Sequence, residues 1–188
     1  MGSIVAGAIA MQRRVVTIFG SGTCRQSDDL YAVVRQLAAT LACAGFVICN
    51  GGYGGTMAAA ARGAVEAGGH TIGVTCSAFR RRANPYVREV RTTATLLERL
   101  DTLVRLGDAY VVLPGGTGTL LELAYVWELI NKRLTPRRKP LVIWNSFWEP
   151  VLACVRQMQP SAATLHRADG IEDVVKYLQR RLLGPAAG

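Results

Sequence analysis

Three glycine-rich turns each follow a short apolar run and lead into a segment with helical character. The turns cover residues 20–23, 50–56 and 114–119. A strand that ends in such a turn and continues as a helix is the repeating unit of a parallel sheet covered by helices. The pattern therefore predicts an α/β fold, a Rossmann-like three-layer sandwich with a mostly parallel central sheet.

Apolar runs and helical periodicity alternate along the rest of the chain as well. Residues 75–93 lose clear periodicity and are rich in arginine, and residues 160–166 read as a poorly defined link. The regular segments follow from apolar spacing and from glycines at their ends. Strands are expected at residues 15–19, 46–49, 71–74, 109–113 and 141–144, and helices at residues 29–44, 57–67, 96–106 and 171–183 and after residues 118 and 147.

The length of the chain suits one domain. Its 188 residues, half of them hydrophobic, are enough for a sizeable core. We expect a loose N-terminal extension at residues 1–12 and a single Rossmann-like nucleotide-binding domain at residues 13–184. The extension lacks a basic region before its apolar residues, so it does not resemble a signal peptide. No apolar run reaches the ~18 residues that a membrane span needs, and no membrane partner is expected.

Cysteine and histidine usage argues against disulfides and metals. The five cysteines are odd in number and have no C-x-x-C spacing, which favours reduced thiols in a cytoplasmic protein. His70 and His166 are far apart in sequence and have no companions at ligand spacing. We expect no metal site.

The net charge of +9 comes mostly from arginine, with clusters at residues 80–82, 137–139 and 180–181. Such charge attracts anionic ligands, including nucleotides and nucleic acid. Aromatic residues are not interleaved with these clusters and no nucleic-acid motif is present, so a nucleic-acid partner is not expected. Solvated basic surface is the favoured interpretation, although residues 80–82 could also close over a nucleotide.

The third turn is the main candidate site. Glycines at three of four positions let backbone N–H groups reach a ligand, and the start of a helix carries orphan donors and partial positive charge. A phosphate is the simplest anion for such a place. Glu122 follows one turn inside the helix, close enough to reach the bound molecule. The candidate phosphate ligands are Gly115, Gly116, Thr117, Gly118 and Thr119.

The other two turns are expected to join this site, because the carboxyl ends of parallel strands meet at one edge of a sheet. Ser21 and Thr23 could bond a ribose or phosphate or could cap the following helix. The glycines of the second turn could contact the nucleotide or could serve close helix–strand packing. The candidate binding residues of the two turns are Gly20, Ser21, Gly51, Gly52, Gly54, Gly55 and Thr56.

Several common chemistries do not fit these motifs. Residues 20–25 lack the third glycine of the dinucleotide fingerprint, and Asn50 stands where NAD-binding proteins usually place an acidic residue. No Walker lysine motif occurs, and neither histidine lies beside a nucleophile elbow. A carboxylate next to a phosphate turn suits hydrolysis of an N-glycosidic bond, because it can stabilise an oxocarbenium-like transition state and orient water. An arginine could assist departure of the base.

Residues 114–122 match the Pro-Gly-Gly-x-Gly-Thr-x-x-Glu signature of the Lonely Guy (LOG) family, and the chain resembles that family over most of its length. Arg99 stands where the family has the arginine of its Met-His-x-Arg-Lys segment, although the lysine is replaced by Leu100. The resemblance implies a Rossmann-like homodimer without a cofactor. It also implies that a cytokinin-type or adenine nucleoside 5′-monophosphate is cleaved to free base and ribose 5-phosphate, with Arg99 and Glu122 as the catalytic pair.

Alternatives remain at the same residues. The chain also resembles molybdenum-cofactor carriers, which use the phosphate turn without hydrolysis. The pair Thr119 and Glu122 has the spacing of a helix capping box, a purely structural role. Arg99 could be a surface residue paired with Glu98 or Asp101.

The helix after residue 118 carries more apolar surface than one face against a sheet requires. This excess predicts packing on a partner helix in a two-fold homodimer. The stripe is formed by Leu120, Leu123, Trp127, Ile130 and Leu134, with Leu121, Val126 and Leu129 outside it.

Overall fold

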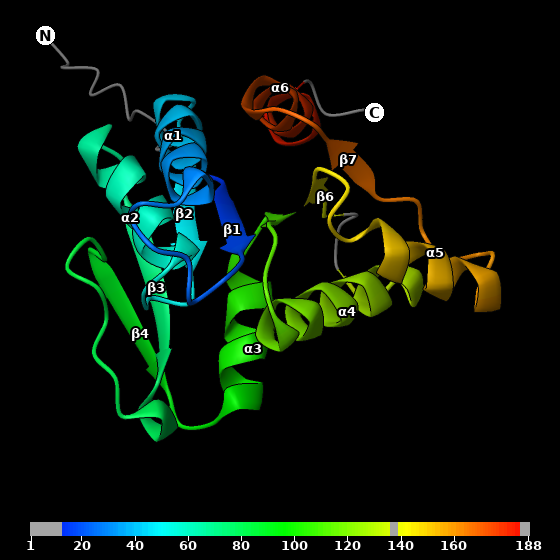
Figure 1. Cartoon of the computed structure of the whole chain (residues 1–188), viewed down its shortest axis with the longest axis horizontal. Coiled ribbons are helices and arrows are strands. Elements are labelled where there is room, and N and C mark those ends of the chain that lie inside the picture. Colours follow the sequence, from blue (N-terminus) through cyan, green and yellow to red (C-terminus); the bar gives the residue numbers. More distant parts are fainter. Residues whose placement is uncertain (1–12, 136–138, 185–188) are drawn as a thin grey trace, which may run out of the picture.

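A computed structural model describes residues 13–135 and 139–184 of the chain. The expected extension at residues 1–12 lies outside the described residues. One seven-stranded sheet has the order β4-β3-β2-β1-β5-β6-β7, and every neighbouring pair is parallel (Figure 1). The predicted α/β Rossmann-like fold is confirmed. The strands are β1 (Val15–Phe19), β2 (Val47–Asn50), β3 (Thr71–Cys76), β4 (Glu89–Thr93), β5 (Ala109–Val112), β6 (Leu141–Trp144) and β7 (His166–Ala168).

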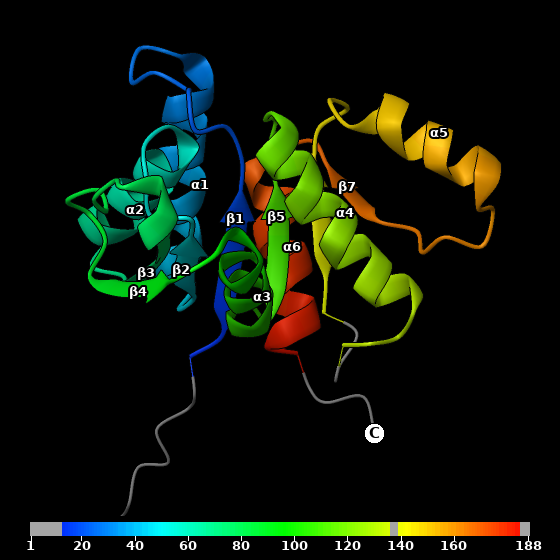
Figure 2. The same cartoon turned by 90° about the horizontal axis from the view of Figure 1, so that it is seen from below.

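Helices cover both faces of the sheet, as Figures 1 and 2 show. One hydrophobic cluster joins the sheet to α1, α2 and α6, and a second joins it to α3, α4 and α5. The central strands are buried along their whole length, which explains their continuous apolar sequences. The helices are α1 (Asp29–Cys43), α2 (Thr56–Glu66), α3 (Leu96–Leu106), α4 (Thr117–Asn131), α5 (Glu149–Met158) and α6 (Ile171–Leu182), and a 3-10 turn, η1, covers Ser77–Phe79.

The segment 75–93, predicted to be irregular, contains β4, so this prediction was wrong in part, and the predicted link at residues 160–166 leads into β7, a strand that was not predicted. β4 pairs with β3 and β7 pairs with β6, and both lie at the edges of the sheet. The three middle residues of β4 are exposed. An edge strand pairs on one side only and needs no continuous apolar run, so its sequence carries little signal. The five strands at residues 15–19, 47–50, 71–76, 109–112 and 141–144 coincide with expected ones or differ by one or two residues.

The chain order reverses between β1 and β5, which are neighbours in the sheet. β1 leads to α1 and β5 leads to α4, and these helices pack on opposite faces. The loops after the two strands therefore diverge and open a crevice at the carboxyl edge, where ligands bind in folds of this kind. A cavity of about 390 Å³ lies there, lined by Ser21, Thr23, Cys24, Asp28, Leu30, Pro114, Gly115, Gly116 and Phe147.

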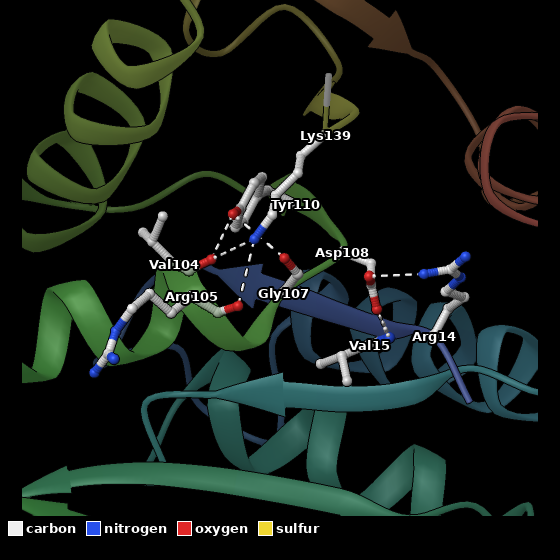
Figure 3. A network of polar contacts seen from close by, with 8 residues as sticks. All are labelled: Arg14, Val15, Val104, Arg105, Gly107, Asp108, Tyr110 and Lys139. Carbon is white, nitrogen blue, oxygen red and sulfur yellow. Dashed lines mark hydrogen bonds and ion pairs between the residues drawn. The ribbon is translucent and has the colours of Figure 1, made fainter. Parts of the chain in front are cut away.

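A polar network lies at the amino edge of the sheet, beside the starts of β1 and β5 (Figure 3). The Tyr110 hydroxyl and the Lys139 ammonium both donate to the Val104 carbonyl oxygen, at 2.6 and 3.0 Å, near the end of α3. The Asp108 carboxylate pairs with Arg14 and accepts from the Val15 amide. Burial raises the pKa of Tyr110 and lowers that of Lys139.

Candidate functional site

The three glycine-rich turns meet at the carboxyl edge of the sheet. The Ser21 amide donates to the Pro114 carbonyl oxygen at 3.1 Å, which ties the first turn to the third. The amide and hydroxyl of Thr56 both donate to the Ser21 carbonyl oxygen, at 2.9 and 3.1 Å, which ties the first turn to the second. The three turns therefore meet at one edge, as predicted, and the cavity there is lined by the first and third turns.

The third turn ends at α4 with little side-chain support. Gly116 is the N-cap of α4 and no side chain caps the helix. A Cβ at Gly116 or Gly118 would meet no atom within 4 Å, and neither glycine has a positive φ. Backbone conformation and packing among the described residues therefore do not require glycine at these two positions. Open space beside uncapped helix donors is what an anion needs.

Gly115 differs from its two neighbours, since a Cβ there would overlap the Thr119 side chain. Thr119 itself is buried and Thr117 is exposed at the first position of α4. The five candidate phosphate ligands therefore surround one helix start. Three of them, Gly116, Thr117 and Gly118, face open surroundings, and two pack against each other.

The first turn is shaped by packing. A Cβ at Gly20 would lie 2.6 Å from the Thr56 hydroxyl, so the absence of a side chain lets the first and second turns touch. The Ser21 hydroxyl accepts from the Thr23 amide and lies 3.1 Å from the Thr23 hydroxyl. Asp28 is the N-cap of α1, so neither hydroxyl caps that helix. The two hydroxyls stay at the crevice.

The glycines of the second turn have identifiable structural reasons. Gly52 and Gly55 have φ of +77° and +66°, which few side-chain-bearing residues adopt. A Cβ at Gly51 would overlap the Arg99 guanidinium, whereas one at Gly54 would have only the Gly22 oxygen, at 3.8 Å, within contact. The second turn thus makes room for an arginine from another element.

Arg99 projects from α3 and is 8% exposed. Its Nε donates to the Val74 carbonyl oxygen at 2.8 Å. The predicted alternative of a surface ion pair is wrong. Glu98 instead forms a capping box with Thr95, and Asp101 pairs with Arg105 at 2.7 Å.

Glu122 faces Arg99 across the start of α4. Its Oε1 lies 3.9 Å from the Arg99 Nη1, and 13% of its side chain is exposed. Burial raises the pKa of Glu122 to about 7, and the positive charge of Arg99 acts in the opposite direction. Within the described residues the carboxylate accepts no hydrogen bond, so it is free to contact a bound molecule. A carboxyl group that titrates near neutrality suits acid–base or electrostatic catalysis.

The alternative of a capping box at this position is also wrong. α4 begins at Thr117, so Thr119 is the third residue of the helix and cannot be its N-cap. Glu122 lies almost a turn too deep to reach the N-cap backbone. The structure thus brings together Arg99 and Glu122, which the sequence places on separate helices.

Two aromatic residues that the sequence analysis did not single out complete the surroundings of Arg99. Its guanidinium carbon lies 5.5 Å from the centre of the Tyr53 ring and 5.8 Å from that of Phe79. In the sequence, the feature that could have pointed to Tyr53 is a large aromatic residue within a turn made mostly of glycines. The arginine-rich segment also approaches this point, with the Arg81 guanidinium carbon 5.5 Å from the Tyr53 ring. Asn84 anchors the segment by donating to the carbonyl oxygens of residues 52 and 53.

Over residues 13–135 and 139–184, no three His, Cys, Asp or Glu side chains come together in a way that could hold a metal ion. Across the same residues, no helix has the length and apolar character to cross a membrane.

Comparisons with known proteins give a family match and curated relatives. Residues 57–177 match the model of a family described as "possible lysine decarboxylase". A cytokinin riboside 5′-monophosphate phosphoribohydrolase of Mycobacterium tuberculosis is 33% identical over 125 residues, covering 63% of this chain and 66% of that protein. The cytokinin riboside 5′-monophosphate phosphoribohydrolase LOG of Oryza sativa subsp. japonica is 31% identical over 148 residues, covering 76% and 60%. The chain spans about three fifths to two thirds of these relatives.

A solved structure shows the same architecture. The molybdenum cofactor binding protein of the phototrophic bacterium Rippkaea orientalis has a TM-score of 0.74 and 23% identity, covering 92% of this chain and 99% of that chain. At this identity the similarity establishes the fold.

Proposed function

Because the chain belongs to the LOG family, whose model is described as "possible lysine decarboxylase", we propose that it is a nucleoside 5′-monophosphate phosphoribohydrolase. It hydrolyses the N-glycosidic bond of a cytokinin-type or adenine nucleoside 5′-monophosphate, such as AMP, and releases the base and ribose 5-phosphate. One observation carries the proposal: a buried arginine and a buried glutamate face each other beside an uncapped, glycine-lined helix start.

The start of α4 binds the phosphate in this proposal. Its first amides have no side-chain cap, and open space surrounds Gly116 and Gly118. The helix dipole favours a negative group at this end. The phosphate contacts Gly115, Gly116, Thr117, Gly118 and Thr119, and the first turn, with Gly20 and Ser21, borders the same crevice.

Glu122 acts on the ribose. Phosphate bound at the first turn of α4 places the sugar near Glu122, which lies one turn further along the same helix. As the bond to the base breaks, positive charge develops on the ribose, and the ionised carboxylate stabilises it. The carboxylate also orients the water that adds to the anomeric carbon, and the proton that this water loses ends on the departing base.

Arg99 acts on the leaving base. The base departs with the electron pair of the broken bond, and a guanidinium beside it stabilises the negative charge that develops. The Arg99 Nη1 lies 3.9 Å from the Glu122 Oε1, so the two groups are close enough to act on neighbouring parts of one nucleotide.

Incubation of the purified chain with AMP and with isopentenyladenosine monophosphate tests the proposal. We expect free base and ribose 5-phosphate in equal amounts, measured by chromatography, and loss of both with Glu122→Gln. Binding of both nucleotides without cleavage would contradict the proposal and favour the second candidate.

The second candidate is a non-catalytic carrier of a phosphorylated small molecule such as a nucleotide or molybdenum cofactor. The structural similarity to a molybdenum cofactor binding protein favours it, since both share the fold over nearly the whole chain. A carrier would retain ligand affinity in Glu122→Gln, because glutamine keeps the size of the side chain. Binding by isothermal titration and turnover, both measured with the wild type and this variant, separate the two candidates, because only the hydrolase has a turnover that the variant loses.

We further propose a homodimer in which α3 and α4 face the partner. Leu123 and Trp127 of the expected stripe pack into the core, and so does Val126, which lies outside the stripe. Leu121 on α4 and Leu97 on α3 are 41% and 73% exposed. Burying such leucines on a partner would remove apolar area from water. Light scattering should report twice the chain mass, and Leu121→Asp should return the monomer.

A further inference from the structure

Tyr53 is locked in place within the second glycine turn. It is 5% exposed, its hydroxyl donates to the Cys76 carbonyl oxygen at 3.2 Å, and it accepts from the Cys76 amide at 2.8 Å. Both bonds go to the end of β3, whose conformation the sheet sets. The ring therefore has one defined position.

This ring forms one wall of the space that holds the Arg99 guanidinium. Phe79 forms another and contacts Tyr53 with ring centres 5.9 Å apart. The Val74 carbonyl oxygen holds Nε, and the backbone of Gly51 lies against Nη2. A guanidinium attracted to two aromatic faces and bonded at Nε has little freedom to move.

The restraint matters because Arg99 and Glu122 do not make a hydrogen bond. Their 3.9 Å separation is longer than the 2.7–2.9 Å of a charge-assisted N–H···O bond. Two opposite charges in a site with little water attract strongly and would close this gap if both could move. The groups around the Arg99 guanidinium must therefore oppose its approach to Glu122. These groups are the two aromatic rings, the Val74 carbonyl oxygen and the backbone of the second turn.

We propose that Tyr53, assisted by Phe79, is a positioning residue that holds Arg99 at a fixed separation from Glu122 and so keeps the carboxylate available to the ligand. The effect of Tyr53 on turnover rests on the proposed hydrolysis. Its effect on the separation of Arg99 and Glu122 does not, because this separation exists in the protein without substrate.

The pKa of Glu122 reports the geometry directly. Burial raises this pKa and Arg99 lowers it, so a displaced guanidinium changes it. The carboxyl carbon can be followed by NMR in protein labelled with [δ-¹³C]glutamate, with its signal assigned by its loss in Glu122→Gln. No substrate is needed.

Tyr53→Leu removes the ring, and Tyr53→Phe keeps it while removing the two hydroxyl bonds. We expect the leucine variant to shift the pKa of Glu122 downward by about half a unit or more, because without the ring Arg99 can approach the carboxylate and its attraction strengthens as the distance falls. The phenylalanine variant should move it less. Since Tyr53 is buried, Phe79→Ala provides a second test at a side chain that is 40% exposed, and it should shift the pKa in the same direction.

A matched control exists elsewhere in the chain. The Arg62 guanidinium carbon lies 5.8 Å from the Tyr86 ring, a contact like that of Arg99 and Phe79. Tyr86→Leu should leave the pKa of Glu122 unchanged. An upward shift in Tyr53→Leu, or an unchanged pKa in folded Tyr53→Leu and Phe79→Ala, would overturn the proposal.

Turnover adds a separate readout. If the wild type hydrolyses AMP, Tyr53→Leu should lower kcat about ten- to hundred-fold while KM changes little, because the phosphate site is intact. If the wild type does not hydrolyse AMP or its cytokinin analogue, the proposed function fails, and the NMR measurement still decides the role of Tyr53.

Discussion

The same four residues, Thr-Leu-Leu-Glu, occur at the start of α3 and of α4, with different results. In α3, Thr95 is the N-cap, its hydroxyl accepts from the Glu98 amide, and the Glu98 carboxylate accepts from the Ala94 and Thr95 amides. In α4, Glu122 makes no such contact and faces Arg99. One tetrapeptide completes a helix end and the other supplies a buried acid.

The difference comes from the residues before the tetrapeptide. Thr95 has extended backbone angles, φ −123° and ψ 163°, and ends the link from β4. Thr119 is instead preceded by Gly116, Thr117 and Gly118. α4 begins at Thr117, two residues before this threonine, whereas α3 begins one residue after Thr95. Glu122 is thereby moved from the third to the sixth helical position. A capping pattern is informative only when the N-cap residue is known, since a helix can start upstream of it.

The largest expected effect separates the two glutamates by activity. Glu122→Gln removes the charge that stabilises the ribose and should lower the rate of base release at least about 100-fold. Glu98→Gln alters only the helix end and should leave the rate close to that of the wild type. Chromatographic measurement of adenine released from AMP compares the two variants. Equal losses would mean that the two tetrapeptides do not differ in function.

The second prediction concerns stability against pH. The pKa of Glu122 rises from 4.5 to about 7 on folding, so between these values the native state holds a proton that the unfolded chain has lost. Stability contributed by this group is present at low pH and falls as pH rises through about 7, by up to about 3 kcal/mol.

Urea unfolding of wild type and Glu122→Gln from pH 4 to 8 measures this contribution as a difference, in which other titrating groups cancel. The difference should shift in favour of the glutamine variant as pH rises. Activity should change in the opposite sense and increase through pH 7, because the ionised form acts on the ribose. A pH-independent difference in stability would show that Glu122 titrates normally.

Much of this arrangement follows from sequence. Buried parallel strands need continuous apolar runs, and the turns after them need glycine, so five of the strands and the crevice were predictable. The edge strands β4 and β7 were not, because exposed residues such as Arg91 and Arg167 give no apolar pattern. Glu122 was predicted from its place one turn after the third glycine-rich turn, and Arg99 was found through the family resemblance. Tyr53 and Phe79 were not, because their role depends on a contact with α3 that no local pattern encodes.

The third prediction isolates the capping box. Thr95→Ala removes the hydroxyl that accepts from the Glu98 amide and should lower the free energy of unfolding by about 1 kcal/mol. Thr95→Ser keeps the hydroxyl and should lower it less. Denaturant unfolding measures both variants, and neither should change the rate of base release. A rate loss in Thr95→Ala, at a temperature where it is fully folded, would place this helix end in the site.

The smallest expected effect is at Gly118, and its direction is the informative part. The second residue of α4 has no neighbour that a Cβ would touch, so Gly118→Ala should raise the free energy of unfolding by up to about 1 kcal/mol. Gly63 is also helical, in α2, but a Cβ there would overlap the Arg35 carbonyl oxygen, and Gly63→Ala should be destabilising.

If Gly118 is kept open for a phosphate, the more stable Gly118→Ala should bind AMP more weakly, because its methyl group takes the place of the ligand's oxygen atoms. Calorimetric titration of AMP and thermal unfolding of the same samples give the two quantities. Higher stability with unchanged affinity would mean that the phosphate binds elsewhere. Lower stability would mean that α4 itself needs this glycine. The difference between the start of α4 and the start of α3, which is capped by Thr95 and Glu98, would then rest on Glu122 alone.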